Sequence, residues 1–527
     1  MDGSYQLSKA VSLPGHQAVA VSKLCEVGWL YRQLHQYTET AAQQTGAGLV
    51  SQSFVTAVRS ELTEYYRLLA GLEQNMREGG VRLLQLMVWT RQPQARLRLL
   101  VEVVTSVGGA RGGALVTRLY TFLSQGDPDL AQCVSTLLSA SCRPLYSMLV
   151  RWLLDGTMED PYNEFFITGE VGVHGESLWH HKYSISVAMM PQFLSLTWAK
   201  RILATGKSIN FLHSVCSDSG PVEARAGVVT RLEELDPACL FRGEVDNPLL
   251  ETVQQLYTLT ARHVLDIMFN KFQLMSHMAA LRKYMLLGQG DIMRYLLDLL
   301  EPELCQPATQ LYPHNLAGIL ETAIRGTNTQ FEDQEILDRL DVRLLEIHAG
   351  ETGWDVFSLD YKVTGPIGVV LTQDTMTHYL MLFNTLWRAK RMEWVLSCTW
   401  KKLASLHKTA KQIPELSPVL HLANLVASEM IHFIHQMAYY TTFEVMECGW
   451  DKLHKQINQA ESLDEVITAH DDFLCTLVSR ALLDDRSRDI LTQLRAIYDR
   501  ILEFQNIANR MHDNAMEEVR YLLTTVT

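Results

Sequence analysis

The sequence predicts an all-α protein built as a stack of small helical bundles. Only 30 glycines and 15 prolines are spread along 527 residues, of which 47% are hydrophobic, so helix breakers are few and core material is ample. Apolar residues recur at three- and four-residue steps over most of the chain, which is the period of an amphipathic helix. At about 150 residues per domain, this length predicts two to four units or a continuous helical stack.

The net charge, the cysteines and the hydropathy pattern argue against several classes of protein. The formal net charge of −13 does not favour nucleic acid or an anionic membrane as the main partner. The nine cysteines are scattered without a CxxC pair, which predicts reduced core residues of a cytosolic protein. The N-terminus lacks a signal-peptide pattern, and no apolar window approaches the roughly 18 residues of a membrane span.

The N-terminal third is expected to hold short, paired, antiparallel helices. Pro93 and Pro144 are each expected to separate two helices, and Asp127 to cap the helix that begins at Pro128. The expected helices are 19–37, 54–75, 81–89, 97–107, 115–124, 130–141 and 145–154.

A change of composition predicts a domain boundary. Residues 216–248 hold three Pro-containing turns and seven acidic residues against three arginines. Such composition is typical of an exposed acidic linker or loop. Domains are therefore expected at 1–215 and 249–527, with 216–248 between them.

The C-terminal half is expected to be helical around a lone strand. Alternation over 357–363 predicts a half-buried strand, which Gly365 and Pro366 end, so at most one short strand or hairpin is expected near 354–371. Asp374 or Thr375 would cap the long helix that follows. The other expected helices are 249–287, 292–300, 315–325, 332–347, 419–443, 464–482 and 489–523.

The long helix after Pro366 predicts one buried and one charged face. Met376, Leu380, Phe383, Trp387, Trp394 and Cys398 recur at helical spacing, which is typical of a core stripe. Trp387 is therefore expected to be core first and a contact residue second. Arg388 and Lys390 lie on the other side and Arg391 beside the stripe. Taken alone, these three favour a solvated face with ion pairs such as Lys390 to Glu393.

Three short patterns resemble phosphate-binding or metal-binding motifs but lack residues that those motifs require. Gly206-Lys207-Ser208 ends like a phosphate-binding loop, but Arg201 stands where that loop needs a glycine, so helix capping is favoured. The histidine pairs His180-His181 and His432/His435 lack further ligands at metal spacing. We therefore expect no catalytic, cofactor-binding or metal-binding residue and no enzymatic activity.

Two blocks of residues resemble the gamma-tubulin complex component family. The second half carries a strand, a proline and a Tyr-x-x-x-Phe-x-x-x-Trp-Arg-x-Lys-Arg helix, which resemble its C-terminal grip motif. In the first half, Leu153 stands where the N-terminal grip motif has Ile. The matching residues are Leu359-Asp360-Tyr361, Pro366, Tyr379, Phe383 and Trp387 to Arg391 in the second half, and Trp152, Gly156, Asp160, Tyr162, Glu164, Phe165 and Phe166 in the first.

The resemblance implies a structural spoke of elongated, all-helical shape. Within the family, segments such as 288–300 and 352–361 are most similar to the subfamily of third components. By this resemblance, 1–215 would be an N-terminal grip domain making lateral contacts, and 249–527 a C-terminal grip domain binding gamma-tubulin. The spoke would template microtubule nucleation at centrosomes and spindle poles in the cytoplasm. Its partners would be gamma-tubulin, the second component, other ring components and, through the ring, microtubule minus ends.

The resemblance also implies site residues. The candidate gamma-tubulin contacts are Trp387, Arg388, Lys390 and Arg391, and the candidate lateral contacts are Arg151, Trp152, Glu164 and Phe165. Compared with the family, we expect a chain lacking the N-terminal extension and cut short within its last helix, with weakened gamma-tubulin binding. A helical-rod tether or adaptor that does not bind gamma-tubulin is the alternative, with membrane-bound partners as its expected ligands; an enzyme is a more distant one.

Overall fold

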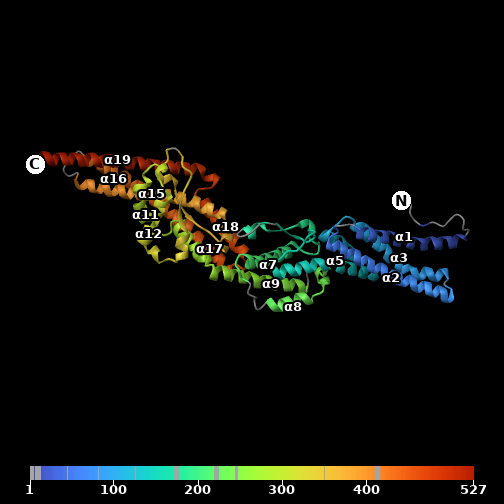
Figure 1. Cartoon of the computed structure of the whole chain (residues 1–527). Helices are drawn as coiled ribbons and strands as arrows, with labels where there is room; N and C mark the ends of the chain where they lie inside the picture. The colour runs from blue at the N-terminus through green and yellow to red at the C-terminus, as the bar shows by residue number, and fades with distance from the viewer. Residues whose placement is uncertain are drawn as a thin grey trace. The chain divides into compact units, whose positions relative to one another are not determined.

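The protein folds into two units joined within one helix. The computed structural model describes residues 5, 13–43, 46–80, 82–124, 126–170, 172, 177–218, 225–243, 247–348, 350–409 and 416–526 (Figure 1). Contacts divide the chain into Met1–Val264 and Leu265–Thr527, called unit 1 and unit 2 below. Both are built mainly of helices, with two short strand pairs, so the predicted all-α class is confirmed.

Unit 1 packs a helical core around α5. Helix α2 lies along α5, and α1 along α3 (Figure 1); Phe54, Leu137 and Trp152 are fully buried in the core of unit 1. The elements of unit 1 are α1 (Gly15–Gln43), α2 (Leu49–Gly79), α3 (Leu83–Val107), α4 (Gly112–Thr121), α5 (Pro128–Asp155), β1 (Ile167–Gly169), α6 (Leu178–His181), β2 (Tyr183–Ile185), α7 (Leu196–Ser214), α8 (Arg225–Glu234) and α9 (Pro248–Asp266), the last of which ends in unit 2.

Two prolines that were expected to separate helices lie inside them. Pro93 is within α3 and Pro144 within α5, so each expected pair of helices is one element. A proline removes one intrahelical hydrogen bond, but the buried face continues on both sides, with Thr90 and Leu97 around Pro93. Packing therefore holds each helix together across its proline. The Asp127 cap is confirmed, because its side chain accepts a hydrogen bond from Asp129 N.

The sequence also missed the first strand pair. Strands β1 and β2 run antiparallel, with Thr168 opposite Ser184. Each is three residues long, too short for a two-residue alternation to be recognised.

Part of the segment 216–248, expected as an exposed linker, is packed structure. Helix α8 inserts Val228 and Leu232 into the core of unit 1, and Cys239 and Phe241 follow them. The acidic residues Glu233, Glu234 and Asp236 of the segment are exposed. Gly220 and Pro221 lie outside the described residues. The acidic composition thus reflected the exposed face of α8, and it gave no indication of the apolar face that packs into the core.

Unit 2 is organised on α15. Helices α16 and α19 both pack on α15 (Figure 1). The elements of unit 2 are a π-helix η5 (Ile267–Lys271), α10 (Leu274–Tyr284), α11 (Gly290–Leu304), α12 (Pro313–Arg325), α13 (Gln334–Arg339), β3 (Leu340–Leu344), α14 (Gly353–Val356), β4 (Phe357–Tyr361), α15 (Gln373–Thr409), α16 (Ser417–Tyr439), a second π-helix η11 (Tyr440–Glu447), α17 (Cys448–Gln459), α18 (Leu463–Arg480) and α19 (Arg488–Val526).

Three expectations for unit 2 are wrong. The helix expected over 249–287 is broken after η5 by Gln273, whose φ is +45°. The sequence has no glycine or proline there that would have indicated a break. The helix expected over 332–347 ends at Arg339, because Leu340, Val342 and Leu344 alternate and pair with β4. The strand is therefore not alone. Helix α17, which continues from η11, was not expected at all.

The cysteines divide between core and surface. Cys133, Cys142, Cys216 and Cys239 are buried as expected, whereas Cys305, Cys448 and Cys475 are exposed, and all nine are free. Within the described part of the chain, no helix combines the length and the apolarity that a bilayer crossing requires.

Candidate functional site

The C-terminal motif begins on the β3–β4 hairpin, where its tyrosine is a core residue. Tyr361 is 2% exposed and its hydroxyl lies 2.6 Å from His277 Nδ1. In the second turn of the motif helix, Tyr379 makes the same kind of pair, with its hydroxyl 3.0 Å from His470 Nε2. Burial raises the pKa of both tyrosines and lowers those of both histidines, that of His470 to about 4. Both pairs are therefore neutral, buried hydrogen bonds.

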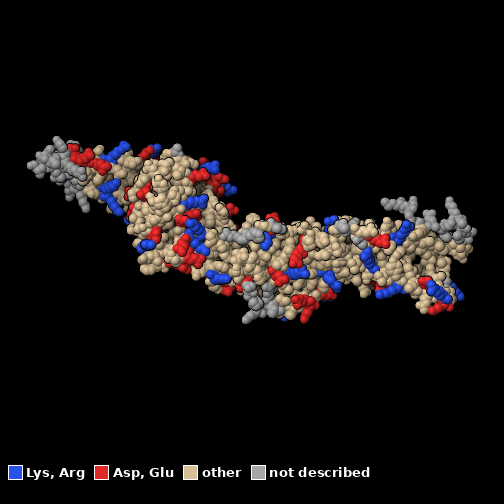
Figure 2. Space-filling view, in the orientation of Figure 1, with Lys and Arg blue, Asp and Glu red and all other residues tan. Residues whose placement is uncertain are grey.

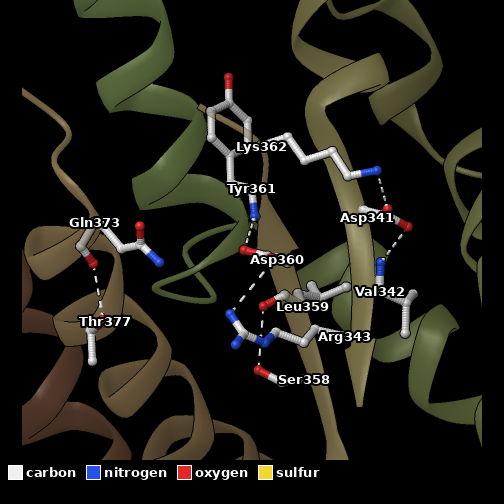
Figure 3. A network of polar contacts seen from close by, with 10 residues as sticks. All are labelled: Asp341, Val342, Arg343, Ser358, Leu359, Asp360, Tyr361, Lys362, Gln373 and Thr377. Atoms are coloured by element: carbon white, nitrogen blue, oxygen red, sulfur yellow. Dashed lines mark hydrogen bonds and ion pairs between the residues drawn. The ribbon is translucent and has the colours of Figure 1, made fainter. Parts of the chain in front are cut away.

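The motif's aspartate faces a second aspartate across the hairpin. Asp360 lies directly opposite Asp341, an arrangement that like charges destabilise. Each is relieved by a cation, with Lys362 Nζ 2.5 Å from Asp341 and Arg343 3.9 Å from Asp360 (Figure 3). The hydrogen bond from Lys362 holds the pKa of Asp341 below its ordinary value. The hairpin thus places its charges on one face and Leu359 and Tyr361 in the core.

Trp387 belongs to an aromatic cluster inside unit 2. It is 1% exposed, stacks on Phe383 with ring centroids 5.7 Å apart, and lies 5.1 Å from Phe357 and 6.3 Å from Trp354. Its burial agrees with the core interpretation of the stripe. The side chain of Trp387, a candidate gamma-tubulin contact, is therefore covered by its own chain in this conformation.

Arg391 joins α15 to the short helix α14. Its guanidinium lies 4.7 Å above the ring of Trp354, a cation–π contact. Burial lowers its pKa, while the charge of Asp355 opposes that shift. Among the described residues, Arg391 Nε finds no hydrogen-bond acceptor. The residue is thus a mostly buried tether, and little of it remains for a partner.

Arg388 and Lys390 are the two candidates of this motif that stay at the surface. Both are half-buried. Lys390 Nζ lies 2.7 Å from Glu393, which confirms the expected helical ion pair. Arg388 forms no ion pair with any residue in the described ranges. Of the four candidate gamma-tubulin contacts, the structure therefore leaves one free cation and one paired cation.

The N-terminal motif is a second internal assembly, built where α5 ends. Trp152 is fully buried, donates from Nε1 to the carbonyl of Ile202 at 2.9 Å, and meets Tyr183 edge-on at 4.7 Å. Gly156 then ends α5 in the left-handed conformation, φ +63°. A Cβ there would lie 2.6 Å from Asn210 N. The motif's glycine is therefore required both by conformation and by its contact with α7.

The motif's carboxylates cap backbone groups. Asp160 accepts from Phe165 N at 2.8 Å. Glu164 is 1% exposed and accepts from Val50 N at 2.9 Å, at the start of α2. The residue before α2 is Gly48, where a Cβ would lie 2.0 Å from Glu164 Oε1. Burial raises the pKa of Glu164, and the amides of Val50, Gly112 and Ser51 oppose that shift. A side chain far along the chain thus supplies the missing helix cap.

The structure places three of the four lateral-contact candidates inside unit 1. Trp152, Glu164 and Phe165 are all buried in unit 1, because the motif's aromatic and acidic residues close the junction of α2, α5 and α7. Only Arg151 is exposed, where it pairs with Glu159 at 2.5 Å. The sequence identified the motif correctly, but it did not separate residues that shape a surface from residues that lie on it.

The imitations of chemical motifs have structural explanations. Gly206 lies inside α7, and a Cβ there would lie 2.1 Å from the Trp152 ring, so it is a packing glycine and not part of the helix cap that was expected. In the described ranges, no group of three or more His, Cys, Asp or Glu side chains could hold a metal ion.

Comparison with known families finds one matching family model for each half of the chain. The model described as Gamma tubulin complex component N-terminal matches residues 2–271, and the one described as Gamma tubulin complex component C-terminal matches residues 274–524. The chain belongs to the gamma-tubulin complex component family. The two motif blocks described above are therefore internal supports of the two halves that match the family.

Individual relatives are third components of this family. The chain is 45% identical to gamma-tubulin complex component 3 homolog of Xenopus laevis, over 99% of this chain and 58% of that protein. It is 45% identical to the Homo sapiens component 3, over 94% of this chain and 56% of that protein. With component 3 of Arabidopsis thaliana the identity is 34%, over 98% and 64%. The chain thus spans little more than half the length of its animal relatives.

Several residues of these supports escaped sequence reasoning. His277, His470 and Trp354 hold the C-terminal motif through side-chain contacts with Tyr361, Tyr379 and Arg391. His470 lies 91 residues from its partner, and nothing local in the sequence connects the two. For Trp354 a signal existed, because it directly precedes the strand and the motif.

Proposed function

We propose that this chain is a structural spoke of the gamma-tubulin complex, which binds gamma-tubulin through unit 2 and neighbouring components through unit 1. The observation that carries the proposal is the match of one family model to each unit, with both grip motifs present as intact supports. Its partners would be gamma-tubulin, the second component and other ring components. It would act at microtubule-organising centres, including centrosomes and spindle poles, to template microtubule nucleation.

The proposal gives the two units separate roles. In unit 2, the hairpin, the aromatic cluster and the Arg391 tether fix α15, and Arg388 is the motif cation that makes neither an ion pair nor a ring contact among the described residues. Arg388 is therefore the residue we propose to contact gamma-tubulin, with Lys390 beside it. In unit 1 we propose that Arg151 lies on the lateral surface that Trp152 and Glu164 support from inside. The GTP of the assembly would belong to the tubulin, and the spoke itself would catalyse no reaction.

Charge reversal at Arg388 tests the first role. The Arg388→Glu variant should bind immobilised gamma-tubulin at least about tenfold more weakly, because reversing an interfacial charge replaces attraction by repulsion. Arg325→Glu, an exposed change on α12 of the same unit, is the matched control and should bind as the wild type does. Equal binding by all three proteins, with unchanged circular dichroism, would reject Arg388 as a contact. No binding by the wild type would remove the gamma-tubulin role and favour a helical tether.

A further inference from the structure

A cavity in unit 2 lies between α11, α15 and α16. Its volume is about 630 Å³, within the range of about 300–1,000 Å³ typical of ligand pockets. Helix α11 contributes Arg294 and Asp298, α15 contributes Trp394, Trp400 and Lys401, and α16 contributes one wall with Ser428, Ile431 and His435. Neither grip motif accounts for it, because only Lys390 of the motif residues lines it.

The cavity exposes aromatic surface to water. Trp400 is 53% exposed, although a tryptophan contributes its full apolar stabilisation only when it is covered. Trp394 is held in place by a 2.7 Å hydrogen bond from its Nε1 to Asp298 Oδ1. One ring is thus fixed and the other is free to be covered. Tryptophan is among the residue types that contribute most to binding energy at interfaces.

The cavity lining carries one more cation than carboxylates, with Arg294, Lys390 and Lys401 against Asp298 and Glu393. Glu393 is paired with Lys390 at 2.7 Å, whereas Asp298 accepts from the neutral indole N–H of Trp394 and keeps its charge. Arg294 on α11 and Lys401 on α15 make neither an ion pair nor a hydrogen bond with any residue of the described ranges. This local excess stands against a chain charge of −13 and against the mixed signs over the face shown in Figure 2. The cavity therefore selects a negatively charged ligand.

We propose that this cavity binds an acidic peptide segment of a partner protein that carries an aromatic or leucine side chain beside its acidic residues. The apolar side chain covers Trp400, and the carboxylates pair with Arg294 and Lys401. Because the two cations come from different helices, a segment that spans the groove satisfies both, as in the helix-in-groove mode of recognition. This inference does not depend on gamma-tubulin binding.

Fluorescence anisotropy with the full chain tests the proposal. The probe is a fluorescein-labelled amphipathic peptide with glutamates on one face and leucine and phenylalanine on the other. It should bind saturably and more weakly as salt rises. The same peptide with glutamines in place of glutamates should bind at least about tenfold more weakly, because it cannot pair with the two cations. Equal binding of the two peptides, or no saturable binding, would overturn the proposal.

Variants locate the site. Trp400→Ala should weaken binding about tenfold or more, and Arg294→Glu and Lys401→Glu should each weaken it about fivefold or more. These three side chains are exposed, so the fold should persist. The matched controls are Trp89→Ala, an exposed tryptophan of unit 1, and Lys455→Glu, an exposed lysine on α17. Cavity variants that bind like these controls would place the peptide elsewhere and reject the assignment.

Discussion

At the scale of single residues, the two grip motifs act from inside the chain. Trp152, Glu164 and Phe165 in unit 1, and Tyr361 and Trp387 in unit 2, are each no more than 2% exposed. Their neighbours lie within the same chain and come from other elements, such as the Val50 amide at the start of α2 that Glu164 caps. The motifs therefore identify important residues, and the burial of most of these residues indicates that they stabilise the fold.

Glu164 provides the first prediction. Glu164→Ala should lower the free energy of unfolding by about 1–3 kcal/mol, because it leaves the Val50 amide buried without an acceptor. Glu164→Gln keeps an acceptor and should cost less. Since burial raises the pKa of Glu164 from its ordinary 4.5, the wild type should gain stability relative to Glu164→Gln as the pH falls from 7 toward 4.5. Urea unfolding of the three proteins at several pH values measures this; a constant difference would contradict it.

His470 predicts the opposite pH dependence. Its pKa is lowered from 6.5 to about 4 in the folded state, so the unfolded chain takes up a proton first. Its contribution should therefore be present above pH 6.5 and decline by about 1.4 kcal/mol per pH unit between 6.5 and 4.

The His470→Gln variant should remove that decline while retaining a polar partner for the Tyr379 hydroxyl. The measurement is the difference in unfolding free energy between wild type and variant at pH 7 and pH 5. If the difference does not shrink at pH 5, then His470 is protonated in the fold and its description as a neutral hydrogen-bond partner fails.

At the scale of elements, the sequence predicted the existence of most helices and missed how they continue or end. Periodicity identified α1, α2, α12, α15, α18 and α19 because each has a long apolar face. It split α3 and α5 at prolines that packing tolerates, and it ran a helix through β3, whose five residues pair with a strand that begins 13 residues after β3 ends. Those outcomes depend on partners distant in sequence, which no local pattern reports.

The same limit applies to the candidate sites. The alternation of apolar and charged residues on α15 predicted both the burial of Trp387 and the Lys390–Glu393 pair. The tether of Arg391 to Trp354 and the cap of α2 by Glu164 could not be predicted. Each joins groups whose proximity is created by the fold.

The contact between α5 and α7 gives a prediction at this scale. Gly206→Ala places a Cβ about where the Trp152 indole lies, 2.1 Å from the ring, so the helices must separate or the ring must turn. Overpacking of this kind costs about 1–3 kcal/mol. Gly71→Ala in α2, where nothing lies within 4 Å, is the control and should be neutral or stabilising by up to about 1 kcal/mol. Thermal unfolding compares them; equal midpoints would show that the α5–α7 contact is loose.

At the scale of the whole molecule, two compact units carry two family halves. The boundary between the two compact units follows Val264. The N-terminal family model ends at residue 271 and the C-terminal one begins at residue 274. Both boundaries lie beyond the acidic segment 216–248, because α8 and the residues after it pack into unit 1. We therefore propose that lateral contacts belong to residues up to the end of α9 and gamma-tubulin contacts to those after it.

This division predicts that surface changes in one unit leave the other unit's partner unaffected. Arg151→Glu should weaken association with the second component, because Arg151 is the exposed member of the N-terminal candidates, and should leave gamma-tubulin binding within about twofold of wild type. Pull-down with each partner separately measures both effects. Loss of both partners by a variant that still folds would mean that the two interfaces overlap.

Gel filtration coupled to light scattering tests the central claim most directly. The purified chain is mixed with gamma-tubulin, with the second component, and with both. We expect a complex whose mass equals one chain plus one gamma-tubulin, and a larger complex when the second component is added. Elution of the chain alone in all three mixtures would contradict its role as a spoke of the gamma-tubulin complex.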